Sequence, residues 1–201
     1  MTKLIKNYIE ILSNNGIIIT STDTVPAIIC NALSDVAVKK IYNIKQRDFT
    51  KPIAIFCANI AMAEQYLTIN QANLCVLDQF APGPITLILE PKSNSNISQN
   101  LNMHGNTIGL RVPKNEFLQE LMLQSNMPLA ATSANLSNKV MTLDEVANYF
   151  INQVDLIDLD GQLKTHDTSS IFDIKNSANI KELRPGPISI KNIKEILARN
   201  L

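Results

Sequence analysis

The chain of 201 residues is 45% hydrophobic and 18% charged, a composition typical of a globular protein and not of a disordered or collagen-like one. Eighteen basic residues balance eighteen acidic ones, so no net charge attracts the whole chain to nucleic acid or to an anionic membrane. The cysteines Cys30, Cys57 and Cys75 have no paired spacing, which favours a reducing compartment over disulfides or a zinc site. No run approaches the roughly 20 apolar residues of a membrane span, and we expect a cytoplasmic protein without membrane attachment.

Short apolar runs alternate with segments of helical periodicity along the chain. The first part predicts an amphipathic helix at 1–12, a buried strand at 16–20 with a polar turn at 21–24, a helix from about its N-cap Ser34, and a strand at 52–57. The middle predicts helices at 60–66 and 70–80, a break at 82–84, a strand at 85–89, a polar loop at 92–106, a strand at 107–112 and a helix around 117–122. The last part predicts a strand at 128–132, a helix near 143–151, strands near 154–159, 169–174 and 179–184, and an amphipathic helix from about 190. We therefore expect one α/β domain over residues 1–201, with a mixed sheet covered by helices.

The sequence lacks the motifs of the commonest nucleotide-binding and hydrolytic sites. It has no G-x-x-x-x-G-K-[ST] or G-x-G-x-x-G segment and only six glycines, so ordinary P-loop and Rossmann sites lack their key residues. It has no H-E-x-x-H motif and no paired C-x-x-C. The two histidines, His104 and His166, lie in polar stretches, and nothing supports a Ser–His–Asp or Cys–His site.

Small polar and cationic residues follow several of the predicted strands. They are the turn Thr22-Asp23-Thr24, the stretch Thr132-Ser133-Ala134-Asn135, the pair Ser169-Ser170, and Arg184 before a Pro-Gly turn. In α/β sheets ligands bind at the carboxyl ends of strands, so these residues could converge in space. Each also has a structural interpretation, because hydroxyl groups after a strand commonly cap a turn or a helix.

Five cations fall within thirteen residues around the end of the second predicted helix: Lys39, Lys40, Lys45, Arg47 and Lys51. They could be solvated side chains that offset the helix dipole. Alternatively, Arg47 and Lys51 could hold an anion, because arginine offers a bidentate fork for phosphate and lysine a point charge.

One arginine, Arg111, lies on the otherwise apolar strand at 107–112. Strand alternation predicts that it shares a face with Thr107 and Gly109. Because burying an unpaired arginine is costly, Arg111 should pair either with a structural carboxylate or with a substrate carboxylate.

Seven stretches together resemble the YrdC/TsaC family, the threonylcarbamoyl-AMP synthases of tRNA modification: STDTVPAI, IKQRDFTKPIAIF, APGPITLIL, TIGLRVP, PLAATSANLSN, SSIFDI and ELRPGPIS. They lie between residues 16 and 190, in the family's order and spacing. The resemblance implies a twisted open α/β sheet with a large cationic concave face. It also implies a nucleotidyltransferase that joins L-threonine, bicarbonate and ATP into L-threonylcarbamoyladenylate and releases pyrophosphate. Downstream threonylcarbamoyl-transfer proteins would then modify the tRNA adenosine beside the anticodon, and a direct contact with tRNA is compatible with this function.

The resemblance also implies the site residues. Those expected to hold ATP are Arg47, Lys51, Thr107, Ser133 and Arg184. Those expected to hold threonine are Thr24, Arg111, Ala131 through its backbone, and Ser169. Lys45 belongs to the same basic motif as Arg47 and Lys51, and these three are the expected catalytic residues. Threonine and bicarbonate can form a carbamate without a catalytic base, so the protein needs only to position the substrates and to stabilise the negative charge on the phosphates. We expect Mg²⁺ to enter bound to the triphosphate, without a protein ligand.

The sequence departs from the family pattern at Pro26-Ala27-Ile28, where relatives usually have Tyr-Gly-Leu, and at Phe56 and Met141, where some relatives have polar ligand contacts. Three other functions stay open: an RNA-binding protein of the same fold without catalysis, a carbamoyltransferase module of HypF type, and a purely structural domain. Overall neutrality disfavours dedicated binding of double-stranded RNA or tRNA. This sequence has none of the acylphosphatase and zinc-binding segments of HypF-type proteins, and a structural domain would leave the polar strand ends unexplained.

Overall fold

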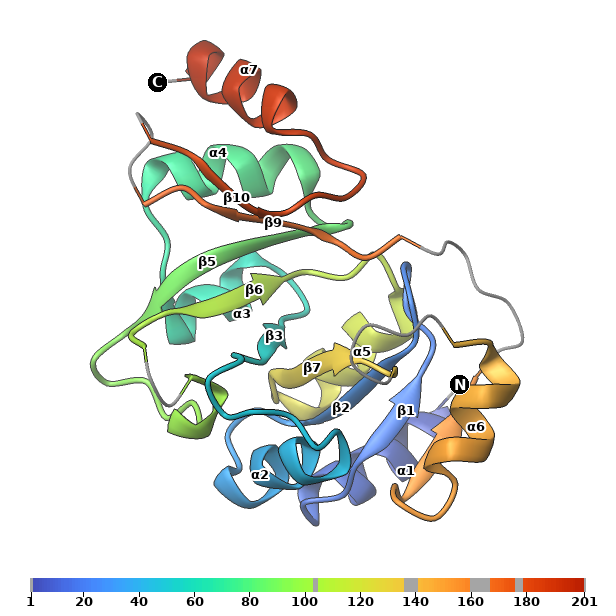
Figure 1. The fold of residues 1–201 in the computed structure, drawn as a ribbon. Coiled ribbons are helices and arrows are strands. Elements are labelled where there is room, and N and C mark those ends of the chain that lie inside the picture. Colours follow the sequence, from blue (N-terminus) through green and yellow to red (C-terminus); the bar gives the residue numbers. More distant parts are fainter. Residues whose placement is uncertain (1, 103–104, 136–140, 160–166, 176–178, 201) are drawn as a thin grey trace.

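The computed structural model of the chain describes residues 2–102, 105–135, 141–159, 167–175 and 179–200 (Figure 1). Its helices are α1 (Thr2–Ser13), α2 (Asp35–Ile44), α3 (Ile60–Tyr66), α4 (Gln71–Phe80), α5 (Glu116–Ser125), α6 (Leu143–Phe150) and α7 (Ile190–Asn200), with a short 3-10 turn η1 (Gln99–Asn102). Its strands are β1 (Ile18–Thr20), β2 (Ala27–Asn31), β3 (Ala54–Phe56), β4 (Leu67–Thr68), β5 (Ile85–Pro91), β6 (Ile108–Arg111), β7 (Leu129–Ser133), β8 (Leu156–Asp158), β9 (Ser170–Asp173) and β10 (Lys181–Arg184).

These strands form one mixed sheet of 10 strands in the order β10-β9-β5-β6-β3-β7-β2-β1-β8, with β4 paired to β5. The pairs β9–β5, β6–β3 and β1–β8 are parallel, and the other pairs are antiparallel. The predicted α/β class with a mixed open sheet is therefore confirmed. The extent of a single domain over residues 1–201 stays a prediction.

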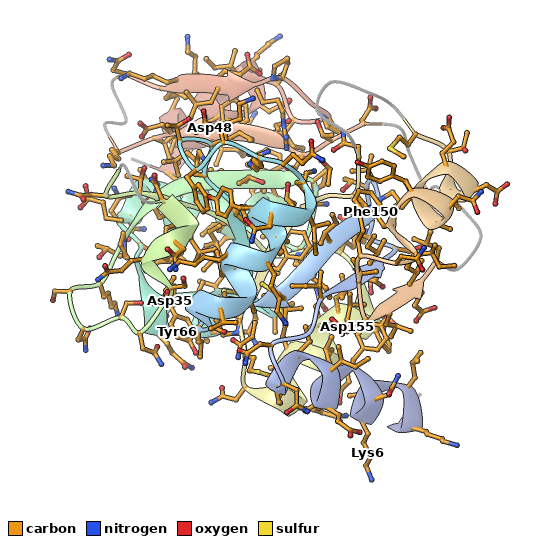
Figure 2. The ribbon with its side chains drawn as sticks, turned by 60° about the horizontal axis from the view of Figure 1, so that its bottom comes forward. Lys6, Asp35, Asp48, Tyr66, Phe150 and Asp155 are labelled. Atoms are coloured by element: carbon orange, nitrogen blue, oxygen red, sulfur yellow. The ribbon has the colours of Figure 1, made fainter. Side chains whose placement is uncertain are left out.

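The helix boundaries follow from local capping chemistry. The side chain of Ser34 accepts a hydrogen bond from the amide of Ala37 at 3.1 Å, which confirms this serine as the N-cap of α2. Capping boxes begin α4 at Asn70 and α6 at Thr142. Helix α1 is amphipathic as predicted, because Ile5, Tyr8 and Leu12 are buried, whereas Lys6 projects away from the body of the molecule (Figure 2).

Two strands were absent from the sequence-based prediction. The apolar run of β2 follows Pro26 directly and is an internal strand of the sheet, between β1 and β7. Its apolar run is as long as those predicted as strands at 85–89 and 128–132, so this strand was detectable from the sequence and was missed. The short β4 follows α3 directly and pairs with the end of β5. The 3-10 turn η1 lies within the predicted loop at 92–106.

The register divides the sheet into two faces of different character. Phe172, Leu87, Leu110 and Ile55 pair in a row across β9, β5, β6 and β3, and each is fully buried. Figure 1 shows α3 behind β6 and β3, and α5 behind the neighbouring β7. Since side chains alternate along a strand, the residues next to this row point to the opposite face. That second face carries the pocket described below.

Among the described residues, no helix combines the length and the apolar character needed to cross a bilayer.

Candidate functional site

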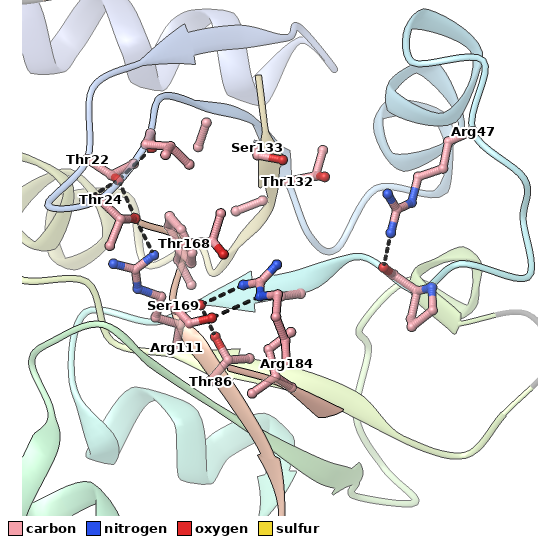
Figure 3. Close-up of a pocket in the computed structure, with 17 residues that line it drawn as sticks. Thr22, Thr24, Arg47, Thr86, Arg111, Thr132, Ser133, Thr168, Ser169 and Arg184 are labelled. Carbon is pink, nitrogen blue, oxygen red and sulfur yellow. Dashed lines mark hydrogen bonds between the residues drawn. The ribbon is translucent and has the colours of Figure 1, made fainter. Parts of the chain in front are cut away.

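A pocket of about 170 Å³ lies over the middle of the sheet, on the face opposite the buried row (Figure 3). It is lined from β2, β3, β5, β6, β7, β9 and β10 and from the segments that follow β1 and α2. The lining residues are Thr22, Thr24, Val25, Ala27, Arg47, Pro52, Ala54, Phe56, Thr86, Arg111, Ala131, Thr132, Ser133, Thr168, Ser169, Ile171 and Arg184.

Small residues on neighbouring strands leave the space for this pocket. Ala54 pairs with Ala131 across β3 and β7, and Ala27 pairs with Ser133 across β2 and β7. Gly109 of β6 lies beside them, where an added Cβ would come within 3.0 Å of Thr86 Cγ2 and 3.3 Å of Ala54 Cβ. Side chains of this size leave the centre of the face hollow, whereas the opposite face is filled by Ile, Leu and Phe.

Arg111 is the most deeply buried cation of the pocket, with 5% of its surface exposed. Its Nη2 donates to the Asp23 carboxylate at 2.8 Å, its Nη1 to Thr24 Oγ1 at 2.8 Å, and its Nε to the carbonyl of Gly83 at 3.1 Å. Burial lowers the pKa of Arg111, and the charge of Asp23 opposes that shift. The prediction left two partners open for Arg111, and the structure pairs it with a carboxylate of its own chain.

A second arginine holds a serine on the other side of the pocket (Figure 3). Arg184 donates through Nε to the carbonyl of Ser169 at 2.9 Å and through Nη2 to Ser169 Oγ at 3.0 Å. The hydroxyl of Ser169 in turn bonds to that of Thr86 at 2.8 Å. Burial, then the positive charges of Arg111 and Arg47, lowers the pKa of Arg184.

The third arginine follows α2. Gln46 adopts a left-handed conformation with φ of 46°, which lets the amide of Arg47 bond back to the carbonyl of Tyr42 at 2.9 Å. The guanidinium of Arg47 donates to the carbonyls of Lys51 at 3.1 Å and Pro52 at 3.0 Å. Burial lowers the pKa of Arg47. Among the described residues, neither Arg47 nor Arg184 forms an ion pair with a carboxylate.

The structure brings seven of the predicted site residues together in the pocket: Thr24, Arg47, Arg111, Ala131, Ser133, Ser169 and Arg184. Lys45 is not among the lining residues, because its side chain runs beneath the end of β7. Lys51 is exposed and contributes no lining atoms. Thr107 lies before β6 and lines a separate cavity with residues from the ranges 91–102 and 105–108. The ligand assigned to each residue stays a prediction.

The departures from the family pattern fall in different places. Ala27 and Phe56 line the pocket, and the guanidinium of Arg111 lies 5.5 Å from the centre of the Phe56 ring. Met141 is buried and is not among the lining residues. His104 and His166 lie outside the described residues.

Sequence reasoning missed Thr86 and Thr168, which both line the pocket. Thr86 was detectable, because it is a polar residue inside the apolar strand predicted at 85–89. The same signal singled out Arg111 in the strand predicted at 107–112. Thr168 had no such signal, since it precedes β9 in an irregular segment.

Within the described ranges of the chain, the residues that line this pocket include no Asp, Glu, His or Cys side chain. Groups of three or more side chains able to hold a metal ion are also absent from the described part of the chain. What the pocket offers is three guanidinium groups, hydroxyl groups and backbone amides, a set that binds anions and stabilises negative charge. Among the described lining residues, none carries a side chain suited to removing a proton from a substrate.

A family model named Sua5/YciO/YrdC and described as "Telomere recombination" matches residues 10–186. A protein of Methanocaldococcus jannaschii named putative threonylcarbamoyl-AMP synthase is 35% identical over 188 residues, which cover 92% of this chain and 86% of that protein. The threonylcarbamoyl-AMP synthase of Mus musculus is 30% identical over 142 residues, and the matched region covers 71% of this chain and only 50% of that relative. The crystal structure of P. abyssi Sua5 complexed with L-threonine superposes with a TM-score of 0.88 at 26% identity, over 96% of this chain and 57% of that one.

Proposed function

This chain belongs to the Sua5/YciO/YrdC family, and we propose that it is an L-threonylcarbamoyladenylate synthase, an enzyme of the nucleotidyltransferase type. The reaction would join L-threonine, bicarbonate and ATP and release pyrophosphate. The product would supply downstream threonylcarbamoyl-transfer proteins that modify tRNA, and the expected compartment is the cytoplasm. Relatives that carry the synthase name, and a related structure described as a complex with L-threonine, support this substrate set.

The observation that carries the proposal is the distribution of charge among the three arginines. Arg111 already has the Asp23 carboxylate as partner, so its surroundings suit a zwitterion better than a polyanion. Arg184 and Arg47 have no carboxylate partner among the described residues, and both sites suit the triphosphate of ATP. The pocket therefore has a part suited to an amino acid and a part suited to a nucleotide.

The chemistry requires little from the protein beyond placement. The threonine amine adds to bicarbonate to give a carbamate and water, and a carbamate oxygen then attacks the α-phosphorus. The bond from that phosphorus to the bridging oxygen breaks, and pyrophosphate leaves with the electron pair. Guanidinium groups at Arg47 and Arg184 would offset the charge that develops on the phosphates, and Mg²⁺ would enter with ATP as part of the substrate.

Ser169, Thr86 and Thr24 would hold the amino acid through their hydroxyl groups. Ser169 is only 4% exposed and is fixed by Arg184 and Thr86, so its oxygen has a defined position in the pocket. A missing methyl group changes binding by only about 1–3 kcal/mol. Serine should therefore replace threonine poorly but measurably.

The test is to incubate the protein with Mg·ATP, bicarbonate and L-threonine and to measure threonylcarbamoyladenylate and pyrophosphate. Both products should require threonine and bicarbonate together. Arg47→Ala should reduce the rate by roughly ten- to a hundred-fold, because it removes hydrogen bonds between charged groups. Arg47→Lys should recover part of the rate, because lysine keeps the positive charge but cannot form the two parallel hydrogen bonds of a guanidinium group.

Lys191→Ala is the matched control, because Lys191 is an exposed cation on α7, outside the pocket. Full pyrophosphate release without threonine would refute the proposed reaction. Failure of the wild type to form the adenylate, together with tight and salt-sensitive tRNA binding, would replace the enzyme with an RNA-binding protein.

A further inference from the structure

Lys45 is a buried cation whose role is not explained by contact with a substrate. Only 6% of its surface is exposed, and it is not among the residues that line the pocket. Its Nζ donates to the carbonyl of Ser133 and to Asn135 Oδ1, the latter at 3.1 Å. Among the described residues it forms no ion pair with a carboxylate. A buried charge without an opposite charge is costly, so the contacts that it does make need an explanation.

Those contacts close a small network at the end of β7. The Ser133 hydroxyl donates to Asn135 Oδ1 at 2.8 Å, and the Asn135 amide donates to the Ser133 carbonyl at 3.0 Å. The amide of Ala134 donates to the carbonyl of Pro26 at 2.8 Å. Lys45 therefore binds the two oxygens that define the turn at residues 133–135.

Lys45 also belongs to the segment after α2 that carries the pocket residue Arg47. It is the C-cap of α2, and Arg47 follows two residues later after the left-handed Gln46. Arg47 and Ser133 both line the pocket, and they come from segments that are far apart in the sequence. Within the described contacts, the ammonium of Lys45 directly joins these two segments.

We propose that Lys45 is a positioning residue that sets the spacing between Arg47 and Ser133 and thereby prepares the pocket for the nucleotide. The proposal rests on the proposed function, since it concerns ATP and not threonine. The threonine side of the pocket, around Arg111 and Ser169, has its own hydrogen bonds and none of them involves Lys45.

The protonation of Lys45 gives this role a measurable signature. Burial, followed by the charge of Arg47, lowers the pKa of Lys45 from its usual value of 10.5 to about 8. Arg47 is the charged group that acts on it from its own loop, and the turn after β7 faces it with the neutral oxygens of Ser133 and Asn135. Above pH 8 the ammonium becomes a neutral amine, and its hydrogen bonds lose the contribution of the charge.

The experiment measures binding of Mg²⁺ with α,β-methylene-ATP, and separately binding of L-threonine, by calorimetry between pH 7 and pH 9. The variants are Lys45→Met, which removes the charge at similar length, and Lys45→Arg, which keeps it. Lys39→Met is the matched control, because Lys39 is an exposed lysine on the same helix. Turnover of each variant gives the Michaelis constant for ATP separately from the maximal rate.

We expect Lys45→Met to weaken binding of the ATP analogue by roughly ten-fold at pH 7 and to leave threonine binding within two-fold. The affinity of the wild type for the analogue should fall as the pH rises through 8, and that of Lys45→Met should not. Lys45→Arg should recover part of the affinity.

Equal losses for the analogue and threonine would overturn the positioning role, and so would a Lys45→Met protein that binds the analogue like the wild type. If Lys45→Met does not fold, the pH dependence of wild-type binding decides the question. These outcomes do not depend on turnover, so a wild type that binds the analogue and forms no adenylate refutes the proposed function alone. A wild type that does not bind the analogue refutes both.

Discussion

Replacing Lys45 by methionine should make the stability of this protein less dependent on pH above 8. The folded state disfavours the charged form of Lys45, because burial lowers its pKa to about 8, whereas the unfolded chain binds the proton up to about 10.5. Between these two values the unfolded state binds more protons than the folded state. The contribution of this group to the free energy of unfolding therefore rises with pH in that window, and the full penalty applies below pH 8.

The magnitude follows from the size of the shift. Each unit of pH within the window changes the free energy of unfolding by about 1.4 kcal/mol for one group, and the change between pH 7 and pH 10 amounts to about 2–3 kcal/mol. Lys45 is almost completely buried, so solvent screening reduces this figure little. The two oxygens that bind Lys45 also accept hydrogen bonds from Ser133 and Asn135, so both keep a partner in Lys45→Met.

The assay is urea unfolding followed by circular dichroism at several pH values between 7 and 10. Other lysines, tyrosines and cysteines also titrate in this range, so the quantity to compare is the difference between wild type and variant at each pH. The free energy of unfolding of the wild type, relative to that of Lys45→Met, should rise by about 2–3 kcal/mol from pH 7 to pH 10. Lys39→Met should show no such trend, because Lys39 is exposed. Parallel curves for wild type and Lys45→Met would refute the reasoning that the charge of Lys45 is buried at a cost.

Three further substitutions test other parts of the site. Asp23→Asn should lower the free energy of unfolding by about 3 kcal/mol, because it leaves the buried Arg111 without its carboxylate, and a change below about 0.5 kcal/mol in urea unfolding would contradict this. Gln46→Gly should be neutral or stabilising by up to about 1 kcal/mol because φ is 46° there, whereas Lys39→Gly in the exposed helix should destabilise by about 0.5–1 kcal/mol; equal losses in a thermal scan would argue against strain at Gln46. Gly109→Val should weaken binding of threonine or the ATP analogue in calorimetry, since its side chain would enter the space beside Thr86. Unchanged affinities would show that neither ligand contacts the pocket wall at Gly109.

Local elements of this protein were predictable because their causes are local. The helix N-cap at Ser34, the amphipathic faces of α1 and α7, and the break before β5 each depend on residues within one or two turns of chain. The motif order identified the family, and it also selected seven of the residues that line the pocket. The strand β2 was missed although its apolar run is as long as those at 85–89 and 128–132, and its place in the sheet is decided by its hydrogen bonds to β1 and β7.

The roles within the basic motif were decided only by the tertiary structure. Lys45 and Arg47 are two residues apart, and composition and spacing treat them alike, yet one lies under the end of β7 and the other lines the pocket. The left-handed Gln46 and the hydrogen bond from Lys45 to the Ser133 carbonyl at the end of β7 separate them. Likewise, the ion pair between Arg111 and Asp23 joins residues 88 positions apart, and only the sheet order brings them to 2.8 Å. Charge and hydrogen-bonding capacity are fixed by residue type, but whether a charge is buried, paired or free to meet a substrate depends on which distant segment folds against it.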